Sequence, residues 1–342
     1  MIKLVNKEDI KEADKNTWSR IKSIDLMEDA GYKMFKRIKN NLINKKIIII
    51  LGKGGNAGDG LVVARYLFEN NYDVSVYLLD ELSSDALINL NRYKGNIAKE
   101  LNLANYDIII DAIFGVGLSR YLDDKYINII NEINDSNKYI ISLDMPSGID
   151  ATNGISYGAY IKCNLLLTVE YLKLGLFLND GLSSYDDYKI IKINLDKPKY
   201  LYNLLELNDF KNIYPKRLNN THKGSFGKAS IIAGSSKYPG ASIISYNSLI
   251  SFMMGLGYQR LYVVKELYDK YQYNPEIIVN KIDSDNGIIK YNENDLNEII
   301  KSSDTISIGM GMDISIDLYN SIKYLLNNFK GILILDADAL NT

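Results

Sequence analysis

Residues 46–67 have the sequence KIIIILGKGGNAGDGLVVARYL, and this stretch decides the fold class of the first half of the chain. The run from Ile47 to Ile50 predicts a buried strand, and the glycine-rich loop after it leads directly into an apolar-periodic segment that predicts a helix. Glycines let backbone amides approach a ligand closely, and a helix N-terminus favours an anion. A phosphate or pyrophosphate group is therefore the expected ligand, although a tight strand-to-helix turn explains the glycines equally well.

The spacing of this loop matches neither common phosphate-binding pattern. It fits neither the dinucleotide fingerprint GxGxxG, followed by an acidic residue about 20 positions later, nor the GxxxxGK[ST] loop. Asn56 and Asp59 add polar side chains that a bare phosphate cradle does not need.

Composition excludes several function classes. The chain has 342 residues, 46% apolar residues and a net charge of −2, which fits two globular domains and gives no sign of a nucleic-acid surface. The single cysteine, Cys163, excludes an internal disulfide framework and favours a small buried side chain over a nucleophile. The first residues are too polar for a signal sequence, and no apolar run approaches the roughly 18 residues of a membrane span. We expect a cytoplasmic protein that contacts no membrane.

Strands and helices are expected to alternate along the first 200 residues. Such alternation predicts a doubly wound parallel sheet, and Asp111 and Asp144 each follow a predicted strand and precede a glycine-bearing loop. The carboxyl edge of that sheet is where ligand chemistry is expected. Further strands are predicted at 73–79, 106–111, 139–143, 165–171 and 188–195, with helices within 9–43 and at 86–101.

The periodic pattern stops around residues 196–220 and then resumes. Two prolines and mixed charge in that stretch indicate a domain boundary. We therefore predict a first domain over 1–200, a linker over 201–213 and a second α/β domain over 214–342. Its strands are expected at 229–233, 260–264, 305–308 and 331–335.

Ordered motifs carry a family resemblance in each half. GKGGNAGDG, DAIFGVGLSR, LDMPSGIDATNG and the segment Thr168–Gly175 resemble the YjeF N-terminal family, the NAD(P)H-hydrate epimerases. HKGSFG, AGSSKYPGA, GMGMD and LDADALN resemble the start of the ADP-dependent NAD(P)H-hydrate dehydratases, which have a ribokinase-like domain. The resemblance implies a Rossmann-like three-layer sheet followed by an incomplete ribokinase-like domain. It also implies bifunctional repair of hydrated nicotinamide nucleotides.

The resemblance implies roles for particular residues. Asn56, Asp111 and Ser147 would hold a potassium ion, and Asp144 and Lys173 would be the acid and base. Taken from the residues alone, Asp144 could equally form an Asx-type turn before Pro146, and Lys173 would more often be a solvated lysine. The implied contacts to the hydrated nucleotide come from Gly55, Asn56, Ala57, Gly58, Asp59, Gly115, Val116, Gly117, Leu118, Ser119, Arg120, Tyr121, Asp144, Ala241 and Gly311.

The implied partners are hydrated NADH and NADPH, and the implied reaction interconverts their R and S forms. The ring nitrogen can expel the hydroxyl at C6, and water can then return to either face. A carboxylate near the ring can handle the proton and stabilise positive charge. The family resemblance also implies a homodimer.

Departures from the family patterns affect both halves. Gly55 stands where the family has an asparagine, and Ala57 stands where it has a glycine, so we expect altered affinity rather than loss of binding. No GTGD motif, which carries the family's dehydratase aspartate, occurs in these 342 residues. We therefore expect a truncated second domain with an open sheet edge and no dehydratase activity by itself. ADP and Mg²⁺ would serve that half only if it were complete.

Two other functions compete with the epimerase hypothesis. The first is a non-catalytic nucleotide-binding or scaffolding module, since a fold of this kind can bind ligands without converting them. The second is an ordinary nicotinamide oxidoreductase, against which the absent GxGxxG fingerprint argues.

Overall fold

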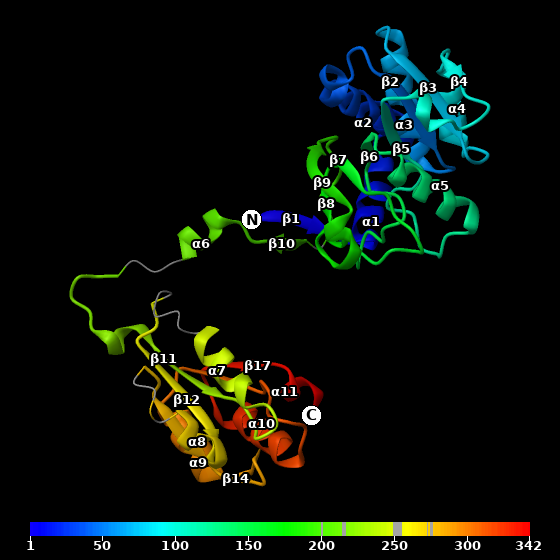
Figure 1. Cartoon of the computed structure of the whole chain (residues 1–342). Coiled ribbons are helices and arrows are strands. Elements are labelled where there is room, and N and C mark those ends of the chain that lie inside the picture. The colour runs from blue at the N-terminus through cyan, green and yellow to red at the C-terminus, as the bar shows by residue number, and fades with distance from the viewer. Residues whose placement is uncertain (200, 214–216, 249–254, 272, 274–275) are drawn as a thin grey trace. The chain divides into compact units, whose positions relative to one another are not determined.

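The structure, a computed structural model, describes residues 1–342 except 200, 214–216, 249–254, 272 and 274–275 (Figure 1). The chain divides into two compact units, Met1–Tyr214 and Pro215–Thr342. Each unit is a layered α/β structure with its own parallel sheet, as the alternation of strands and helices predicts.

A seven-stranded parallel sheet forms the centre of the first unit. Its order is β4-β3-β2-β5-β6-β7-β9, so the chain reverses its direction of travel across the sheet between β2 and β5. Ligands bind at such a switch point in open parallel sheets. The strands are β2 (Lys46–Leu51), β3 (Asp73–Leu78), β4 (Asn96–Ile97), β5 (Ile108–Ala112), β6 (Tyr139–Leu143), β7 (Cys163–Val169) and β9 (Tyr185–Ile191).

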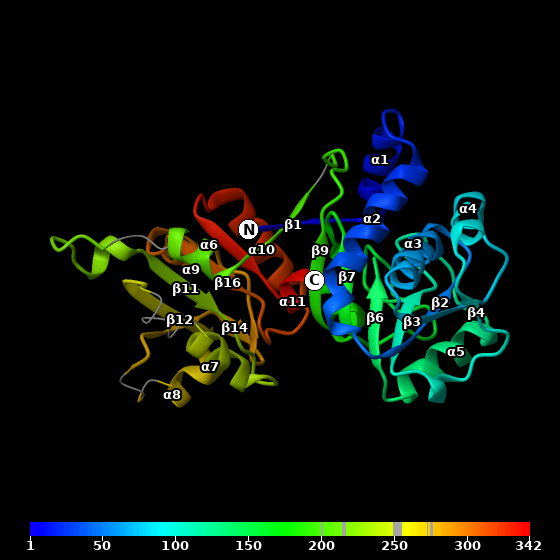
Figure 2. The ribbon, with the colours of Figure 1, turned by 90° about the horizontal axis from the view of Figure 1, so that it is seen from above.

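Helices cover both faces of this sheet, as Figures 1 and 2 show. The isoleucines of β2 alternate between the two faces: Ile47 and Ile49 pack with the side that includes α2 and α3, and Ile48 and Ile50 pack with the side that includes α5. This double burial explains why the strand is a continuous apolar run. The helices are α1 (Lys7–Trp18), α2 (Ser23–Ile38), α3 (Gly55–Glu69), α4 (Ser84–Arg92) and α5 (Asp124–Asp135), with short 3₁₀ turns at Lys39–Asn41, Leu103–Asn105, Leu174–Phe177 and Asn179–Ser183.

The helix predicted over 86–101 is too long. Helix α4 ends at Arg92, and Asn96 and Ile97 form the edge strand β4 beside β3. The hydroxyl of Tyr93 donates a hydrogen bond to the carbonyl of Val74, 3.0 Å away, which holds the chain against β3 where a helix would have turned away.

A second, three-stranded sheet was not predicted from the sequence. Strand β1 (Ile2–Val5) pairs antiparallel with β10 (Tyr202–Leu204) and parallel with β8 (Leu172–Lys173). The stretch expected as a linker, 201–213, contains β10 and helix α6 (Leu207–Ile213). This small sheet places the start of α1 next to the strand that carries Lys173.

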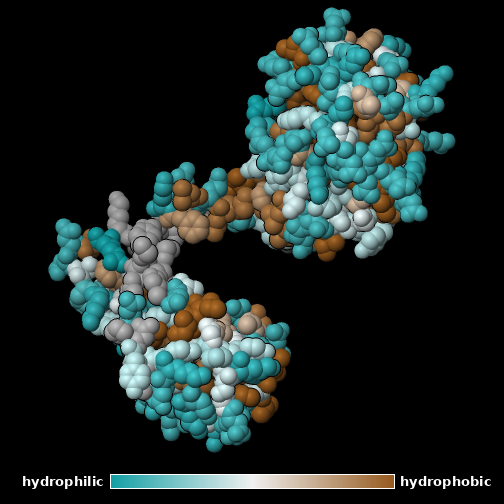
Figure 3. All heavy atoms as spheres, viewed as in Figure 1, coloured by the Kyte–Doolittle hydropathy of each residue, from teal (hydrophilic) through white to brown (hydrophobic). Residues whose placement is uncertain are grey.

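The second unit has a five-stranded parallel sheet of order β13-β12-β11-β16-β17. Ile231, Ile306 and Leu325 are fully buried in its core. Edge strand β17 exposes Ile332 (66%) and Ile334 (46%). Figure 3 shows hydrophobic residues on the surface of this unit. The elements are β11 (Lys228–Ile232), α7 (Pro239–Ser248), β12 (Tyr258–Val264), α8 (Lys265–Tyr271), β13 (Val279–Ile282), β14 (Ser284–Asp285), β15 (Ile288–Ile289), α9 (Glu293–Lys301), β16 (Thr305–Ile308), α10 (Ile316–Asn328), β17 (Ile332–Leu335) and α11 (Asp338–Asn341), with a 3₁₀ turn at Lys223–Phe226.

Within the part of the chain that the structure describes, no helix is both long enough and apolar enough to cross a membrane.

Candidate functional site

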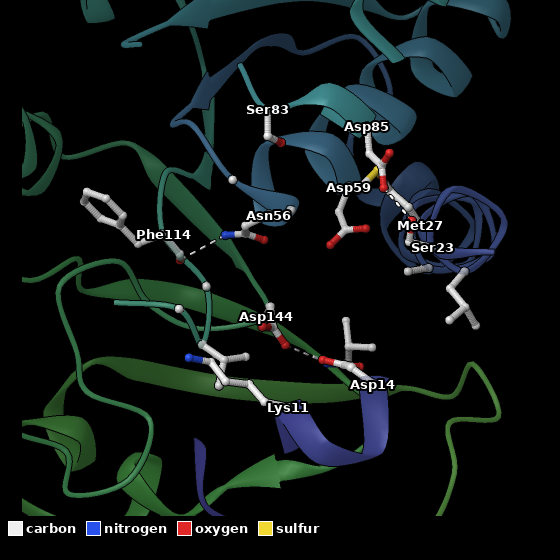
Figure 4. Close-up of a pocket in the computed structure, with 18 of the residues that line it drawn as sticks. Lys11, Asp14, Ser23, Met27, Asn56, Asp59, Ser83, Asp85, Phe114 and Asp144 are labelled. Carbon is white, nitrogen blue, oxygen red and sulfur yellow. Dashed lines mark hydrogen bonds between the residues drawn. The ribbon is translucent and has the colours of Figure 1, made fainter. Parts of the chain in front are cut away.

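A cavity of about 1380 Å³ lies at the carboxyl edge of the first unit's sheet (Figure 4). The N-terminus of α3, the loop after β5, and helices α1 and α2 contribute to its walls. Helix α3 begins at Gly55 without a side-chain cap, so its first backbone N–H groups are open to a ligand.

Asp144, directly after β6, reaches this cavity from a constrained backbone. Its φ is +63°, in the left-handed region, and its backbone N–H donates to the carbonyl of Leu167 at 2.7 Å. One carboxylate oxygen forms an ion pair with Lys173 and accepts a 3.3 Å hydrogen bond from the N–H of Val169. These partners lie on β7 and β8, so the Asx-type turn considered for Asp144 does not form.

The other carboxylate oxygen of Asp144 faces the loop after β5. A Cβ added at Gly115 would lie 3.1 Å from it and 3.4 Å from the Cβ of Asn56. A glycine at position 115 therefore keeps the space beside this oxygen open.

Lys173 is fully buried, which excludes the solvated surface lysine as its role. Its ammonium group donates to Asp144, to the hydroxyl of Thr168 at 2.9 Å and to the carbonyl of Val169 at 3.1 Å. An ammonium group has three N–H donors, and all three are used here. Lys173 therefore positions Asp144 and has no free N–H to offer a ligand.

Asp111, in β5, is buried and completely hydrogen-bonded. One oxygen accepts from the hydroxyl of Ser142 at 2.7 Å and the N–H of Ser147 at 3.0 Å. The other accepts from the hydroxyl of Ser147 at 2.5 Å and the N–H of Ile113 at 3.2 Å. Burial raises the pKa of Asp111, and the hydrogen bonds from Ser147 oppose that rise. Asp111 and Ser147 lie behind the cavity wall rather than in it.

Asn56 is 7% exposed and lies in the cavity wall. Its amide nitrogen donates to the carbonyl of Phe114 at 3.0 Å, whereas its amide oxygen is buried without a hydrogen-bond partner. An orphaned acceptor of this kind costs free energy unless a donor or a cation completes it. The cavity wall therefore has an oxygen suited to a bound cation or a ligand donor.

Two further carboxyl groups, Asp14 on α1 and Asp59 on α3, also line the cavity. Burial and the neighbouring Asp144 raise the pKa of Asp14 to about 6, and Lys173 opposes that rise. Part of Asp59 is solvent-accessible, yet burial, followed by Asp144 and Asp14, holds the pKa of its carboxyl well above the ordinary value. The described part of the chain contains no group of three or more His, Cys, Asp or Glu side chains that could hold a metal ion.

Asp14 is the site residue that the sequence analysis missed. The sequence predicts only a helix within this segment, and Ile10, Ala13 and Thr17 form its buried face. Asp14 lies at the edge of that face, and only the placement of α1 against the sheet brings it to Asp144 (Figure 4). No local motif marks the residue.

Most of the residues implied as substrate contacts line the cavity, and a few do not. Ala57 is fully buried in the core, Gly58 packs against Met27, and Tyr121 is 76% exposed and borders a separate cavity of about 280 Å³. Those that line it are Gly55, Asn56, Asp59, Gly115, Val116, Gly117, Leu118, Ser119, Arg120 and Asp144, and the acid–base candidate Lys173 lines it as well.

Ala241 and Gly311 lie together in the second unit. Gly311 has φ +65°, and a Cβ added there would collide with the methyl group of Ala241. The side chain of Asp338 accepts hydrogen bonds from the N–H groups of Met312 and Asp313, each 3.0 Å long, and so holds the loop after β16.

Some known families match one unit of the chain, and some known proteins match both units. Residues 23–175 match the family described as YjeF-related protein N-terminus, and residues 229–342 match the family described as NAD(P)H-hydrate dehydratase. The two matched stretches fall in the first and second units, respectively.

Similar curated proteins cover almost the whole chain. A bifunctional NAD(P)H-hydrate repair enzyme of Dictyoglomus turgidum is 32% identical over 99% of this chain and 71% of its own length. A protein of the same description from Thermofilum pendens is 31% identical over 92% of this chain and 64% of its own length. An NAD(P)H-hydrate epimerase of Oenococcus oeni is 36% identical over 46% of this chain and 79% of its own length. The chain thus spans about two thirds of the length of its bifunctional relatives.

Proposed function

The chain belongs to the family of bifunctional NAD(P)H-hydrate repair enzymes, and from that premise we propose that its first unit interconverts the R and S forms of hydrated NADH and NADPH. The observation that carries the proposal is Asp144, anchored by the buried Lys173 and open on its other side to a large cavity. The cavity exceeds the roughly 300–1,000 Å³ typical of small-ligand pockets, which suits a dinucleotide.

The phosphates of the nucleotide would bind at the uncapped N-terminus of α3 and the loop Gly115–Tyr121. Free N–H groups at a helix N-terminus favour anions, and Gly115 and Gly117 permit close backbone approach. Arg120, at the cavity wall, adds a cation at the end of this loop.

Asn56, Asp111 and Ser147 would hold the potassium ion that the family resemblance implies. The partnerless amide oxygen of Asn56 supports this assignment, and amide, carboxylate and hydroxyl oxygens suit a hard monovalent cation. Asp111 and Ser147 already bond to each other, so Asn56 contributes the oxygen that most needs a partner. When bound, the ion would add positive charge near the substrate phosphates.

The reaction needs charge stabilisation and proton transfer at C6 of the reduced nicotinamide ring. As the hydroxyl leaves, positive charge develops across the ring nitrogen and C6, and the Asp144 carboxylate would stabilise it. Lys173 would keep that carboxylate fixed, because all of its N–H groups are committed to Asp144, Thr168 and Val169.

In a chain as long as its bifunctional relatives, the second unit would be part of a domain that dehydrates the hydrated nucleotides and depends on ADP and Mg²⁺. Ala241 and Gly311 would lie near the hydrated nucleotide. The family's GTGD motif is absent from these 342 residues. We therefore expect the polypeptide of these residues, assayed alone, to form no NADH when ADP is supplied.

The test is a time course of hydrated NADH, separated into its two forms by chromatography, with and without the protein. We expect the protein to accelerate interconversion above the uncatalysed rate, and Asp144→Asn to lose roughly 100-fold or more of that acceleration. Asp135→Asn, an exposed aspartate at the end of α5, is the matched control and should behave as wild type.

Asp144→Asn leaves the Lys173 ammonium buried without its charged partner, so the double variant D144N/K173M serves as a second test that avoids this defect. A wild-type protein that binds hydrated NADH but does not accelerate interconversion would make the binding module the better description. NADH formation with ADP would contradict the expectation for the second unit.

A further inference from the structure

Asp14 and Asp144 point toward one another in the cavity (Figure 4). Asp14 lies in α1, which comes before the stretch of the first unit that matches the family, residues 23–175. Helix α1 is fixed at its start by Asn6, which caps it, and by the N–H of Lys7, which donates to the hydroxyl of Thr152 at 3.0 Å. The position of α1 therefore determines where the Asp14 side chain lies.

The carboxyl of Asp14 points toward the carboxyl of Asp144 (Figure 4). Asp144 uses one oxygen for Lys173, and that lysine has no N–H left for Asp14. Two carboxylates this close, in a partly buried site, resist carrying two negative charges, so one retains a proton more readily. The rise in the pKa of Asp14 to about 6 has burial and Asp144 as its causes. The other charged side chains in the cavity wall are Lys11, Lys22, Lys53, Asp59, Asp85 and Arg120.

An independent observation marks the same cavity as a ligand site. The amide oxygen of Asn56, on the opposite wall from α1, is buried without a partner (Figure 4). The carboxyl groups are therefore part of a site with an unfilled polar position, and not a solvated acidic surface.

We propose, on the basis of the epimerase function proposed above, that Asp14 carries the proton that leaves and returns with the C6 hydroxyl, while Asp144 remains the ionised partner. The protonated carboxyl of Asp14 gives its proton to the hydroxyl oxygen. The C6–O bond breaks with its electron pair on oxygen, and the lone pair of the ring nitrogen forms a nitrogen–carbon double bond, which leaves a water molecule and a positively charged ring.

The reverse steps complete the change of configuration. A water oxygen bonds to C6 on the other face, and the electron pair of the nitrogen–carbon double bond returns to nitrogen. The proton released by that water goes back to the Asp14 carboxylate. No oxidant or reductant is needed, and Asp14 ends in its starting state.

The two other candidates for this proton are less suited. Lys173 has every N–H committed and lies beneath Asp144. The pKa of Asp59 is held well above the ordinary value, so this carboxyl releases its proton reluctantly. A group whose pKa lies nearer the working pH can both give and accept a proton efficiently.

Epimerisation of hydrated NADH by wild type, Asp14→Asn, Asp14→Glu and Glu12→Gln tests the inference. Asparagine matches the shape of aspartate but cannot release a proton, so kcat should fall by about 100-fold or more while KM changes by less than about threefold. Asp14→Glu should restore part of the activity. Glu12, exposed on the same helix, is the matched control and should leave kcat unchanged.

The pH profile separates proton transfer from a structural role. Wild-type kcat should decrease as pH rises through the pKa of Asp14, and that decrease should disappear in Asp14→Asn. Wild-type acceleration with an unchanged kcat and pH profile in Asp14→Asn would overturn this inference alone. No acceleration by wild type would overturn the proposed function and this inference with it.

Discussion

Asp111 and Asp144 lie at the carboxyl ends of neighbouring strands, yet their surroundings are opposite. Both oxygens of Asp111 are filled by hydrogen bonds from Ser142, Ser147 and Ile113. Asp144 has one oxygen bound to Lys173 and Val169, and its other oxygen faces the open space beside Gly115. Asp111 therefore links the loops after β5 and β6 through hydrogen bonds. Asp144, at the cavity, has hydrogen bonds from Lys173 and Val169 to only one of its carboxylate oxygens.

The difference lies in hydrogen-bond satisfaction and not in position on the sheet. Both residues follow the same rule of aspartate at a strand end and glycine soon after. The number of committed oxygen positions distinguishes them. The following changes test that distinction, in order of decreasing effect.

Asp111→Ala should cause the largest loss of stability. It removes the acceptor for two serine hydroxyls and two backbone N–H groups, so we expect the free energy of unfolding to fall by about 3–5 kcal/mol. Urea unfolding followed by Trp18 fluorescence measures it, because Trp18 is the only tryptophan and lies in the first unit. A loss no larger than that of Asp135→Ala would show that the network does not support the fold.

Lys173→Met should cost somewhat less and should depend on pH. It leaves the Asp144 carboxylate buried without its ion-pair partner, which lowers the free energy of unfolding by roughly 2–4 kcal/mol at pH 7.5. Without the lysine, the negative charge is buried without a partner, so stability should recover as pH falls because protonation removes that charge.

The double variant D144N/K173M is the control for this prediction. It removes both charges together, so its stability should exceed that of Lys173→Met at pH 7.5 and should lack the recovery at low pH. If the single and double variants were equally stable, the ion pair would not be what Lys173 contributes.

Asp14→Asn should stabilise the protein at neutral pH while it removes activity. The pKa of Asp14 is raised from 3.8 to about 6, so the folded state holds an extra proton in this pH window and wild-type stability falls as pH rises through it. Asparagine carries no charge to bury, so at pH 7.5 the variant should be about 1–2 kcal/mol more stable than wild type.

Unfolding of wild type and Asp14→Asn at pH 4 and pH 7.5 measures this effect. The two proteins should differ less at pH 4 than at pH 7.5. If wild type and Asp14→Asn were equally stable at both pH values, burial and Asp144 would not be raising the pKa of Asp14 in the folded state.

Gly115→Ala should have the smallest effect. Its methyl group would lie 3.1 Å from the open oxygen of Asp144, so the neighbours must shift slightly at a cost of about 1 kcal/mol or less. We expect kcat/KM for hydrated NADH to fall by less than about tenfold. Gly240→Ala is the matched control, since no atom lies within 4 Å of the added methyl and Gly240 lies in the second unit, so it should resemble wild type.

The sequence predicts the sheet of the first unit well because local signals agree there. Ile47 to Ile50 form a buried strand with a helix start close behind, and the strand over 139–143 is observed with those bounds. Local signals also placed Asp111 and Asp144 at the ligand edge. The pattern could not say which of the two would be satisfied, because that depends on donors from Ser142, Ser147 and Lys173.

The remaining features depend on pairing across long sequence distances. Strands β1, β8 and β10 are two to four residues long, too short for a periodic pattern, and they meet only in the folded unit. Asp14 was missed for the same reason, because its role depends on where α1 lies. The burial of Lys173 also follows from this sheet, and the family resemblance, not the local sequence, pointed to the residue.

The small sheet has a consequence for the order in which the site is assembled during protein synthesis. Strand β1 is translated about 200 residues before its partner β10, a lead of roughly 10–40 s at 5–20 residues per second. Helix α1 can coil on its own within microseconds, but Thr152, whose hydroxyl holds the start of this helix, is translated 145 residues after Lys7. The cavity wall that α1 supplies is thus completed only after most of the first unit has been translated.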